Sequence, residues 1–127
     1  MKKRILVVDD EIDLVETLRF SLELEGYEVL VAYNGEDALH LARNENPDLI
    51  LLDVMLPKMD GYKVCRLLKF DARFSHIPIF MLTAKTQEKD RMIGEQTGAD
   101  EYITKPFEME DLMKKVKEYL KEKIKRE

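Results

Sequence analysis

Short runs of apolar residues alternate along the chain with longer segments in which apolar residues recur at helical spacing. The apolar runs predict strands, because an uninterrupted apolar stretch of this length is typical of a strand buried on both faces. These strands extend over residues 4–8, 27–32, 48–52, 78–82 and 99–103. The intervening segments predict helices over residues 11–25, 35–43, about 61–70, about 86–96 and about 108–125. Strands that alternate with helices predict an α/β fold with a mostly parallel sheet and helices on both of its faces.

Polar and glycine residues mark the ends of several predicted helices. Asp10 is a candidate N-cap of the first helix, and Gly26 is a candidate stop at its C-terminal end. Asn34 is a candidate N-cap of the second helix. The charged tail after Leu120 is either the frayed end of the last helix or the start of a linker to a further domain.

Length and composition limit the function classes. A chain of 127 residues predicts one domain, residues 1–127, and its net charge of −5 argues against direct nucleic acid contact. The single cysteine, Cys65, lies in an apolar helical pattern, which predicts a buried structural thiol. The sequence has no signal peptide and no apolar run near the roughly 18 residues of a membrane span. We therefore expect a cytoplasmic protein without membrane contact.

Polar side chains follow four of the predicted strands, at the point where each strand ends. Asp9 and Asp10 follow the first strand, Asp53 the third, Thr83 the fourth and Lys105 the fifth. In a doubly wound sheet the carboxyl ends of the strands share one edge, so these side chains can converge. Carboxylates packed together raise one another's pKa unless a cation is present, and oxygen ligands without His or Cys suit Mg²⁺. The sequence therefore predicts a Mg²⁺ site and a candidate phosphate acceptor at this edge.

Each of these residues also has an ordinary structural interpretation. Asp10 alone can be an N-cap, Asp53 can begin a turn, Thr83 can be a plain strand residue, and Lys105 can be a surface lysine. Their joint occurrence at four strand ends favours the functional interpretation.

At this point the sequence resembles the receiver domains of bacterial response regulators, closest in pattern to receivers of the winged-helix (OmpR/PhoB) type. The resemblance covers nearly the whole chain and rests on the segments 5–11, 47–57, 59–61, 81–84 and 98–107. It implies a flavodoxin-like fold, in which a doubly wound five-stranded parallel sheet in the order 2-1-3-4-5 is surrounded by five helices. It also implies a function in two-component phosphorelay signalling, in which the domain is a phosphoprotein that carries an aspartyl phosphate.

The resemblance assigns roles to individual residues. Asp53 would be the phosphoacceptor for a histidine kinase. Mg²⁺ would be bound by Asp10 and Asp53 directly, by Asp9 through water, and by the backbone carbonyl of Met55. The protein would not be a conventional enzyme, because the domain would only assist its own phosphorylation and dephosphorylation.

Three more residues would respond to the phosphoryl group. Lys105 would pair with Asp53 before the reaction and with the phosphoryl group after it, and the peptide bond from Lys105 to Pro106 would be cis. Thr83 would bond to the phosphoryl oxygen, and Tyr102 would swing inward into the space that Thr83 vacates. The switched surface would be formed by the fourth helix, the fifth strand and the fifth helix.

The resemblance also implies partner surfaces. The sensor histidine kinase would contact a stripe of the first helix and one residue beside it: Asp13, Leu14, Thr17, Ser21 and Phe107. A phosphorylation-dependent homodimer would use charges near the last two helices: Arg91, Asp100, Glu101, Asp111 and Lys115. Lys115 stands where such receivers commonly have Arg, and the two are not interchangeable in bidentate pairs. A free-standing regulator or phosphorelay protein is the alternative to the receiver of a DNA-binding transcription factor.

Two other classes fit the residues less well. A haloacid-dehalogenase-type phosphatase also uses an Asp nucleophile and Mg²⁺, but needs a second acid two residues after the first, where this chain has Met55. A flavodoxin-like phosphate-binding protein needs a hydroxyl- or Gly-rich loop after the first strand, and the acidic segment 9–11 has the wrong charge for it. The resemblance further places Met55 and Lys85 at positions that flank the path of the hydrolytic water, and long side chains at these positions predict a persistent phosphoryl group.

Overall fold

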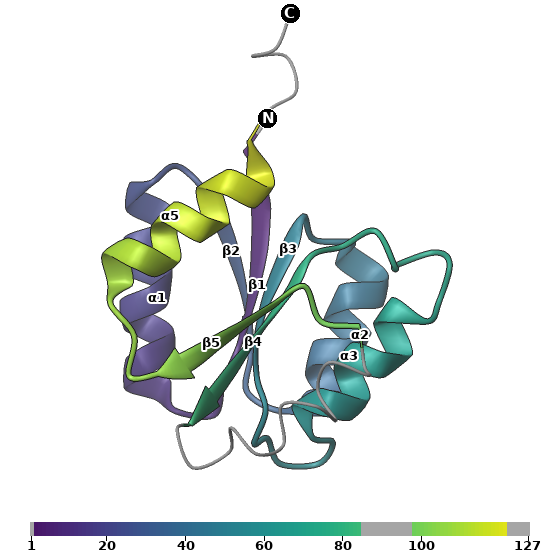
Figure 1. The fold of residues 1–127 in the computed structure, drawn as a ribbon. Helices are drawn as coiled ribbons and strands as arrows, with labels where there is room; N and C mark the ends of the chain where they lie inside the picture. Colours follow the sequence, from purple (N-terminus) through teal and green to yellow (C-terminus); the bar gives the residue numbers. More distant parts are fainter. Residues whose placement is uncertain (1, 85–97, 122–127) are drawn as a thin grey trace, which may run out of the picture.

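The computed structural model describes residues 2–84 and 98–121, which form a parallel sheet covered by helices on both faces (Figure 1). The sheet has five strands in the order β2-β1-β3-β4-β5, as expected. In chain order the strands are β1 (Arg4–Val8), β2 (Glu28–Ala32), β3 (Leu49–Asp53), β4 (Ile79–Ala84) and β5 (Glu101–Lys105). The described helices are α1 (Ile12–Leu24), α2 (Gly35–Glu45), α3 (Gly61–Lys69) and α5 (Met109–Leu120). The helix predicted over residues 86–96, and the end of the last helix beyond residue 121, lie outside the described residues.

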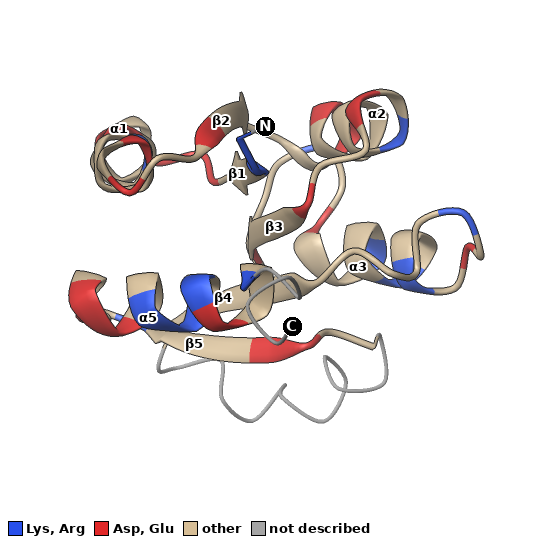
Figure 2. Ribbon diagram, turned by 90° about the horizontal axis from the view of Figure 1, so that it is seen from above, with Lys and Arg blue, Asp and Glu red and all other residues tan. Residues whose placement is uncertain are grey.

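Alternate residues of the central strands enter two separate hydrophobic cores, because successive side chains of a strand point to opposite faces. One core is formed against α2 and α3 and contains Leu6, Ile50 and Met81. The other is formed against α1 and α5 and contains Val7 and Leu51. Figure 2 shows the two helix pairs on opposite sides of the sheet. The uniform apolar character of these strands is therefore explained by burial on both faces.

The helix ends follow the predicted signals in two of three cases. The Asn34 side chain accepts a hydrogen bond from the backbone N–H of Asp37 and caps α2. Gly26 follows Glu25, the C-cap residue of α1, and has a φ of 96°, the left-handed conformation that glycine adopts without strain. The prediction for Asp10 was wrong, because Glu11 occupies the N-cap position of α1 and makes no side-chain cap hydrogen bond. Asp10 is thus free of the capping role that its place in the sequence suggested.

The structure also tests the predictions for the single cysteine and for membrane spans. Cys65 is fully buried among apolar side chains, as predicted. None of the helices in residues 2–84 and 98–121 has the length and apolar character needed to cross a membrane.

Candidate functional site

The carboxyl ends of β1 and β3 bring three acidic side chains together. Val8 of β1 pairs with Leu52 of β3, so the next residues along the two strands, Asp9 and Asp53, lie side by side. Carboxylate oxygens of Asp9, Asp10 and Asp53 all lie within 4.8 Å of one another. Asp9 is fully buried and Asp53 is only 6% exposed, whereas Asp10 is exposed. The cluster therefore has a buried base and one side open to solvent.

Lys105 reaches this cluster from the end of β5, across the intervening strand β4. Its ammonium group donates a hydrogen bond of 2.8 Å to Oδ2 of Asp9 and lies 3.2 Å from Oδ1 of Asp53. The other carboxylate oxygen of Asp9, Oδ1, accepts a hydrogen bond of 2.9 Å from the backbone N–H of Glu11. Asp9 is thus held on both of its oxygens, and it fixes the lysine beside Asp53.

The surroundings of Asp53 disfavour its negative charge. Burial, followed by the negative charge of Asp9, raises the pKa of Asp53 from 3.8 to about 6, although Lys105 acts in the opposite direction. Burial alone would lower the pKa of Lys105, but its hydrogen bond to Asp9 and the charges of Asp53 and Asp9 raise it above the ordinary value. The site therefore contains a cationic lysine next to a carboxylate whose negative charge is destabilised.

The donor set fits a hard divalent cation. Among the residues that the structure describes, three carboxylates face one ammonium group, and neither His nor Cys is part of the cluster. Mg²⁺ is bound in proteins by one or two carboxylates together with water and phosphate oxygens, and it keeps several waters. The exposed Asp10 leaves the solvent access that such a hydrated ion needs.

Thr83 and Tyr102 lie on neighbouring strands next to this cluster. Thr83 is buried in β4 and pairs with Thr104 of β5, and Leu82 pairs with Asp53. Tyr102 of β5 is half-buried against the core that α2 and α3 cover, and its hydroxyl oxygen is shielded from solvent. Tyr102 therefore points into the protein in this structure.

Three of the site residues lie within strands, whereas the sequence had suggested that they follow the strands. Asp53 is the last residue of β3, Thr83 is the fifth residue of β4, and Lys105 is the last residue of β5. Their convergence at one sheet edge was nevertheless predicted correctly for the three acids and the lysine. The peptide bond from Lys105 to Pro106 is cis, as the resemblance implied. The side chain of Met55 is exposed, and Lys85 lies outside the described residues.

The stripe expected to contact a kinase is partly exposed. Asp13 and Thr17 are exposed on α1, and Ser21 is half-buried on the same helix. Leu14 and Phe107 are half-buried and pack against the core between the sheet, α1 and α5. The Leu14 side chain therefore packs partly against the core and remains partly accessible at the surface of α1.

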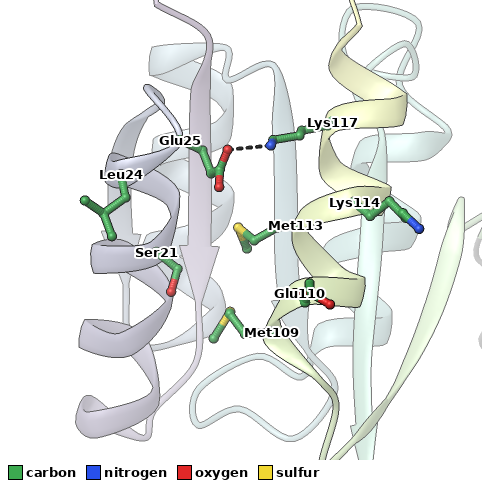
Figure 3. Close-up of a pocket in the computed structure, with 8 residues that line it drawn as sticks. All are labelled: Ser21, Leu24, Glu25, Met109, Glu110, Met113, Lys114 and Lys117. Atoms are coloured by element: carbon green, nitrogen blue, oxygen red, sulfur yellow. Dashed lines mark ion pairs between the residues drawn. The ribbon is translucent and has the colours of Figure 1, made fainter.

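A groove between α1 and α5 adjoins this stripe and was not expected from the sequence (Figure 3). It has a volume of about 500 Å³, and Ser21 belongs to both the stripe and the groove lining. Met109 and Met113 of α5 project into the groove toward α1. An ion pair of 2.6 Å between Glu25 and Lys117 spans it at one end. Methionines at helical spacing were an available signal, but a core role explains them equally well in the sequence.

The residues expected to form a dimer face make contacts within the chain. Asp100 accepts hydrogen bonds from the Lys69 ammonium group at 3.0 Å and from the backbone N–H of Ile79 at 2.8 Å. Glu101 lies 3.4 Å from the Lys115 ammonium group and accepts a 2.7 Å hydrogen bond from the Tyr119 hydroxyl. Asp111 is exposed on α5, and Arg91 lies outside the described residues.

Comparisons with known proteins agree with this geometry. Residues 5–117 match the family model described as the response regulator receiver domain. The alkaline phosphatase synthesis transcriptional regulatory protein PhoP of Bacillus subtilis (strain 168) is 50% identical over 121 residues, which are 95% of this chain and 50% of that protein. The chain thus spans about half the length of this curated relative.

Two solved structures show the same fold. A putative response regulator from Chloroflexus aurantiacus J-10-fl is 36% identical, with a TM-score of 0.89 over 96% of this chain and 100% of the other. A CheY-like receiver domain protein from Methanospirillum hungatei JF-1 is 33% identical, with a TM-score of 0.89 over 100% of both chains.

Proposed function

The chain belongs to the response regulator receiver family, and we propose that Asp53 is the residue that accepts the phosphoryl group. The observation that carries this proposal is the setting of Asp53, a carboxylate at a strand end with Lys105 at 3.2 Å and two further acids beside it. No packing requirement explains three carboxylates at this edge, and their mutual repulsion has to be offset by cations.

The proposed reaction is a phosphoryl transfer from a phosphohistidine of the kinase. A carboxylate oxygen of Asp53 attacks phosphorus, a new P–O bond forms, and the P–N bond to the histidine breaks. The electron pair of that bond stays on the departing imidazole nitrogen, and the product is an acyl phosphate. Catalysis in this kind of reaction consists mainly of positioning and charge neutralisation. A domain that supplies only these is a phosphoacceptor that assists its own modification, and not a conventional enzyme.

Mg²⁺ is the proposed cofactor, and it would neutralise charge on the transferring phosphoryl oxygens. Asp10 and Asp53 are the proposed direct ligands, Asp9 a ligand through water, and the backbone carbonyl of Met55 a further ligand. The cluster of three acids supports this assignment, since hard oxygen donors suit Mg²⁺.

Lys105 and Thr83 are proposed to hold the phosphoryl group after transfer. The lysine already stands beside Asp53, so it can turn to a phosphoryl oxygen without a large movement. The Thr83 hydroxyl, one residue beyond the strand partner of Asp53, would donate a hydrogen bond to the same group. Tyr102, one strand further, is proposed to report the change to the surface around β5 and α5.

A receiver domain implies a histidine kinase partner. We propose that the kinase contacts the stripe described above, because Asp13 and Thr17 are exposed on α1. Ser21 belongs to both the stripe and the lining of the groove between α1 and α5. In this groove the side chains of Met109 and Met113 offer an apolar surface next to the stripe. The expected cytoplasmic location stays a prediction.

The output of the whole protein is a separate proposal. The curated relative is named as a transcriptional regulator and is twice as long as the matched segment, which supports a receiver joined to an output domain. The similarity to this longer relative does not favour the alternative, in which the protein is a free-standing regulator. A net charge of −5 supports an output in which this domain makes no nucleic acid contact of its own. Dimerisation would require Asp100 and Glu101 to exchange their present partners for those of a second copy.

Intact-mass measurement after incubation with acetyl phosphate and Mg²⁺ tests the proposed acceptor. We expect one phosphoryl adduct on the wild type, dependence of the adduct on Mg²⁺, and its loss in Asp53→Ala. Asp71→Ala is the matched control, because it removes an acid that pairs with Arg73 on the exposed surface. An adduct that survives in Asp53→Ala would show that the acceptor is another residue.

A further inference from the structure

The loop between β3 and α3, residues 54–60, carries the Met55 carbonyl that the proposed function uses as a metal ligand. Its end next to α3 is packed directly on the backbone of Asp53. The Gly61 N–H donates a hydrogen bond of 2.8 Å to the Val54 carbonyl, and a Cβ at position 61 would lie 2.1 Å from the carbonyl oxygen of Asp53. Only glycine permits this approach, so α3 fixes one end of the loop.

The middle of the same loop is packed against the start of α2. The Gly35 N–H donates a hydrogen bond of 3.2 Å to the carbonyl oxygen of Pro57. A Cβ at position 35 would lie 1.8 Å from the carbonyl oxygen of Met59 and 2.8 Å from its Cβ. The contact is therefore with backbone that cannot rotate away, and it needs glycine at the first residue of α2.

Between Pro57 and Met59, the two residues that contact Gly35, the loop has an uncommon backbone conformation. Lys58 has a φ of 69°, a left-handed value that costs a residue with a side chain roughly 1 kcal/mol or more. Leu56 and Met59 are partly buried and pack against the core beside α2 and α3. Such a conformation persists only where the surroundings enforce it, and the surroundings here are the two glycine contacts and this core packing.

We propose that Gly35 is a positioning residue for the metal and phosphoryl site, because α2 holds the loop that presents the Met55 carbonyl. Gly35 itself is not one of the acidic, lysine or threonine side chains of the site. It acts through Pro57 and Met59, of which Pro57 lies two residues from Met55 in the sequence. This inference rests on the proposed function, since it concerns the geometry of the same site.

A methyl group at position 35 has a defined effect on this arrangement. Real Cβ atoms essentially never lie within 3.0 Å of another heavy atom, so either α2 or the 57–59 turn has to move. The displacement required is roughly 1 Å, and misplacement on this scale is enough to cost a site a large part of its activity. Because the opposite end of the loop is held by Gly61, the movement falls on the segment that contains Met55.

The experiment compares Gly35→Ala with Gly26→Ala in the full chain. Gly26 is a matched control, because its φ of 96° makes alanine unfavourable while a Cβ there would meet nothing within 4 Å. It lies between α1 and β2, at the amino-terminal edge of the sheet, opposite the acidic cluster. Both variants should lose stability, but only Gly35→Ala should disturb the site.

Two readouts separate positioning from stability. Amide NMR shifts of residues 54–59 in the metal-free protein should change in Gly35→Ala and stay as in wild type in Gly26→Ala. The Mg²⁺ dissociation constant from titration calorimetry should rise about tenfold or more in Gly35→Ala, the size of effect seen when groups that orient metal ligands are lost. Gly26→Ala should bind Mg²⁺ as wild type does.

The outcomes are distinguishable. Equal Mg²⁺ affinity in both variants and the wild type would overturn the inference and leave the proposed function intact. A wild type that binds no Mg²⁺ and takes no phosphoryl group would overturn both. If Gly35→Ala does not fold, the double variant Gly35→Ala/Lys58→Gly is compared with Lys58→Gly alone, since glycine at 58 lets the turn yield to the new methyl group. Weaker Mg²⁺ binding in the double variant would support the inference, and equal binding would overturn it.

Discussion

Replacing Asp53 with asparagine should make the metal-free domain more stable at neutral pH. The Asp53 carboxyl has a pKa raised from 3.8 to about 6 by burial and by Asp9. When the pKa of a carboxyl group is higher in the folded state than in the unfolded state, ionisation of the group destabilises the folded protein. The free energy of unfolding is therefore highest at low pH, where the group is protonated in both states. That stability is lost as the pH rises from the unfolded pKa through the folded one. Asparagine keeps the shape and the acceptor for Lys105 but carries no charge, so it avoids this loss.

The size of the gain follows from the shift. Each pKa unit corresponds to about 1.4 kcal/mol, so the difference between 3.8 and about 6 is worth about 3 kcal/mol above pH 7. The same relation leaves less than about 1 kcal/mol at pH 4, where the carboxyl is protonated in the folded state and partly protonated in the unfolded state. The expected signature is therefore a gain in the free energy of unfolding that shrinks toward low pH.

Urea denaturation of wild type and Asp53→Asn, at pH 7.5 and pH 4 in the presence of a chelator, measures this difference. Asp71→Asn is the control, because the pKa of Asp71 is shifted in the opposite direction to that of Asp53. Its partly exposed carboxyl has a pKa lowered to about 2, chiefly by the hydrogen bond from the Arg73 side chain, so loss of that charge should not stabilise the protein. Added Mg²⁺ should stabilise the wild type and reduce the advantage of the variant. An Asp53→Asn variant that is no more stable than wild type at pH 7.5 would refute the electrostatic reasoning.

Three further predictions concern other side chains of the structure. Lys105→Met should tighten Mg²⁺ binding roughly tenfold in calorimetry, because a cation 2.8 Å from Asp9 is removed, while the yield of phosphoryl adduct by mass spectrometry should fall. Thr83→Val should still take the phosphoryl group but should abolish the phosphorylation-induced change of a fluorotyrosine NMR signal at position 102; a full change would exclude the hydroxyl from the switch. Lys69→Met should lower the free energy of unfolding by about 2 to 4 kcal/mol, because the ammonium group serves two backbone carbonyls and a carboxylate. The exposed Lys63→Met on the same helix should change it by less than about 0.5 kcal/mol, and equal losses in both would contradict the reasoning.

The contacts of Lys69 and Asp100 also bear on the dimer hypothesis. The Lys69 ammonium group binds the carbonyls of Ser75 and Ile77 and the carboxylate of Asp100, so it ties the segment after α3 to the start of β5. An Asp100 that already has a cation and a backbone N–H gains less from an intermolecular partner than an exposed one would. The exposed Asp111 keeps its full capacity for such a contact.

The strands were located from the sequence with small errors at their ends. Uniform apolar runs identify strands buried on both faces, because no alternation with polar residues is needed there. The ends of β3, β4 and β5 were placed too early, since the polar residues Asp53, Thr83 and Lys105 were interpreted as following the strands. Backbone pairing continues through them, because the ladder hydrogen bonds do not depend on the polarity of the side chain.

The sequence by itself determined the alternating strands and helices, the acidic cluster with its lysine at one sheet edge, and the family. All of these follow from local patterns, since strand periodicity and the polar residue at each strand end are read within a few positions. Tertiary structure alone decided the contact of Gly35 with Met59, the tie between Lys69 and Asp100, and the groove between α1 and α5. These pairs are far apart along the chain, and their approach depends on how helices pack on the sheet. Packing is set by the summed shape of many buried side chains, so no short segment of sequence records it.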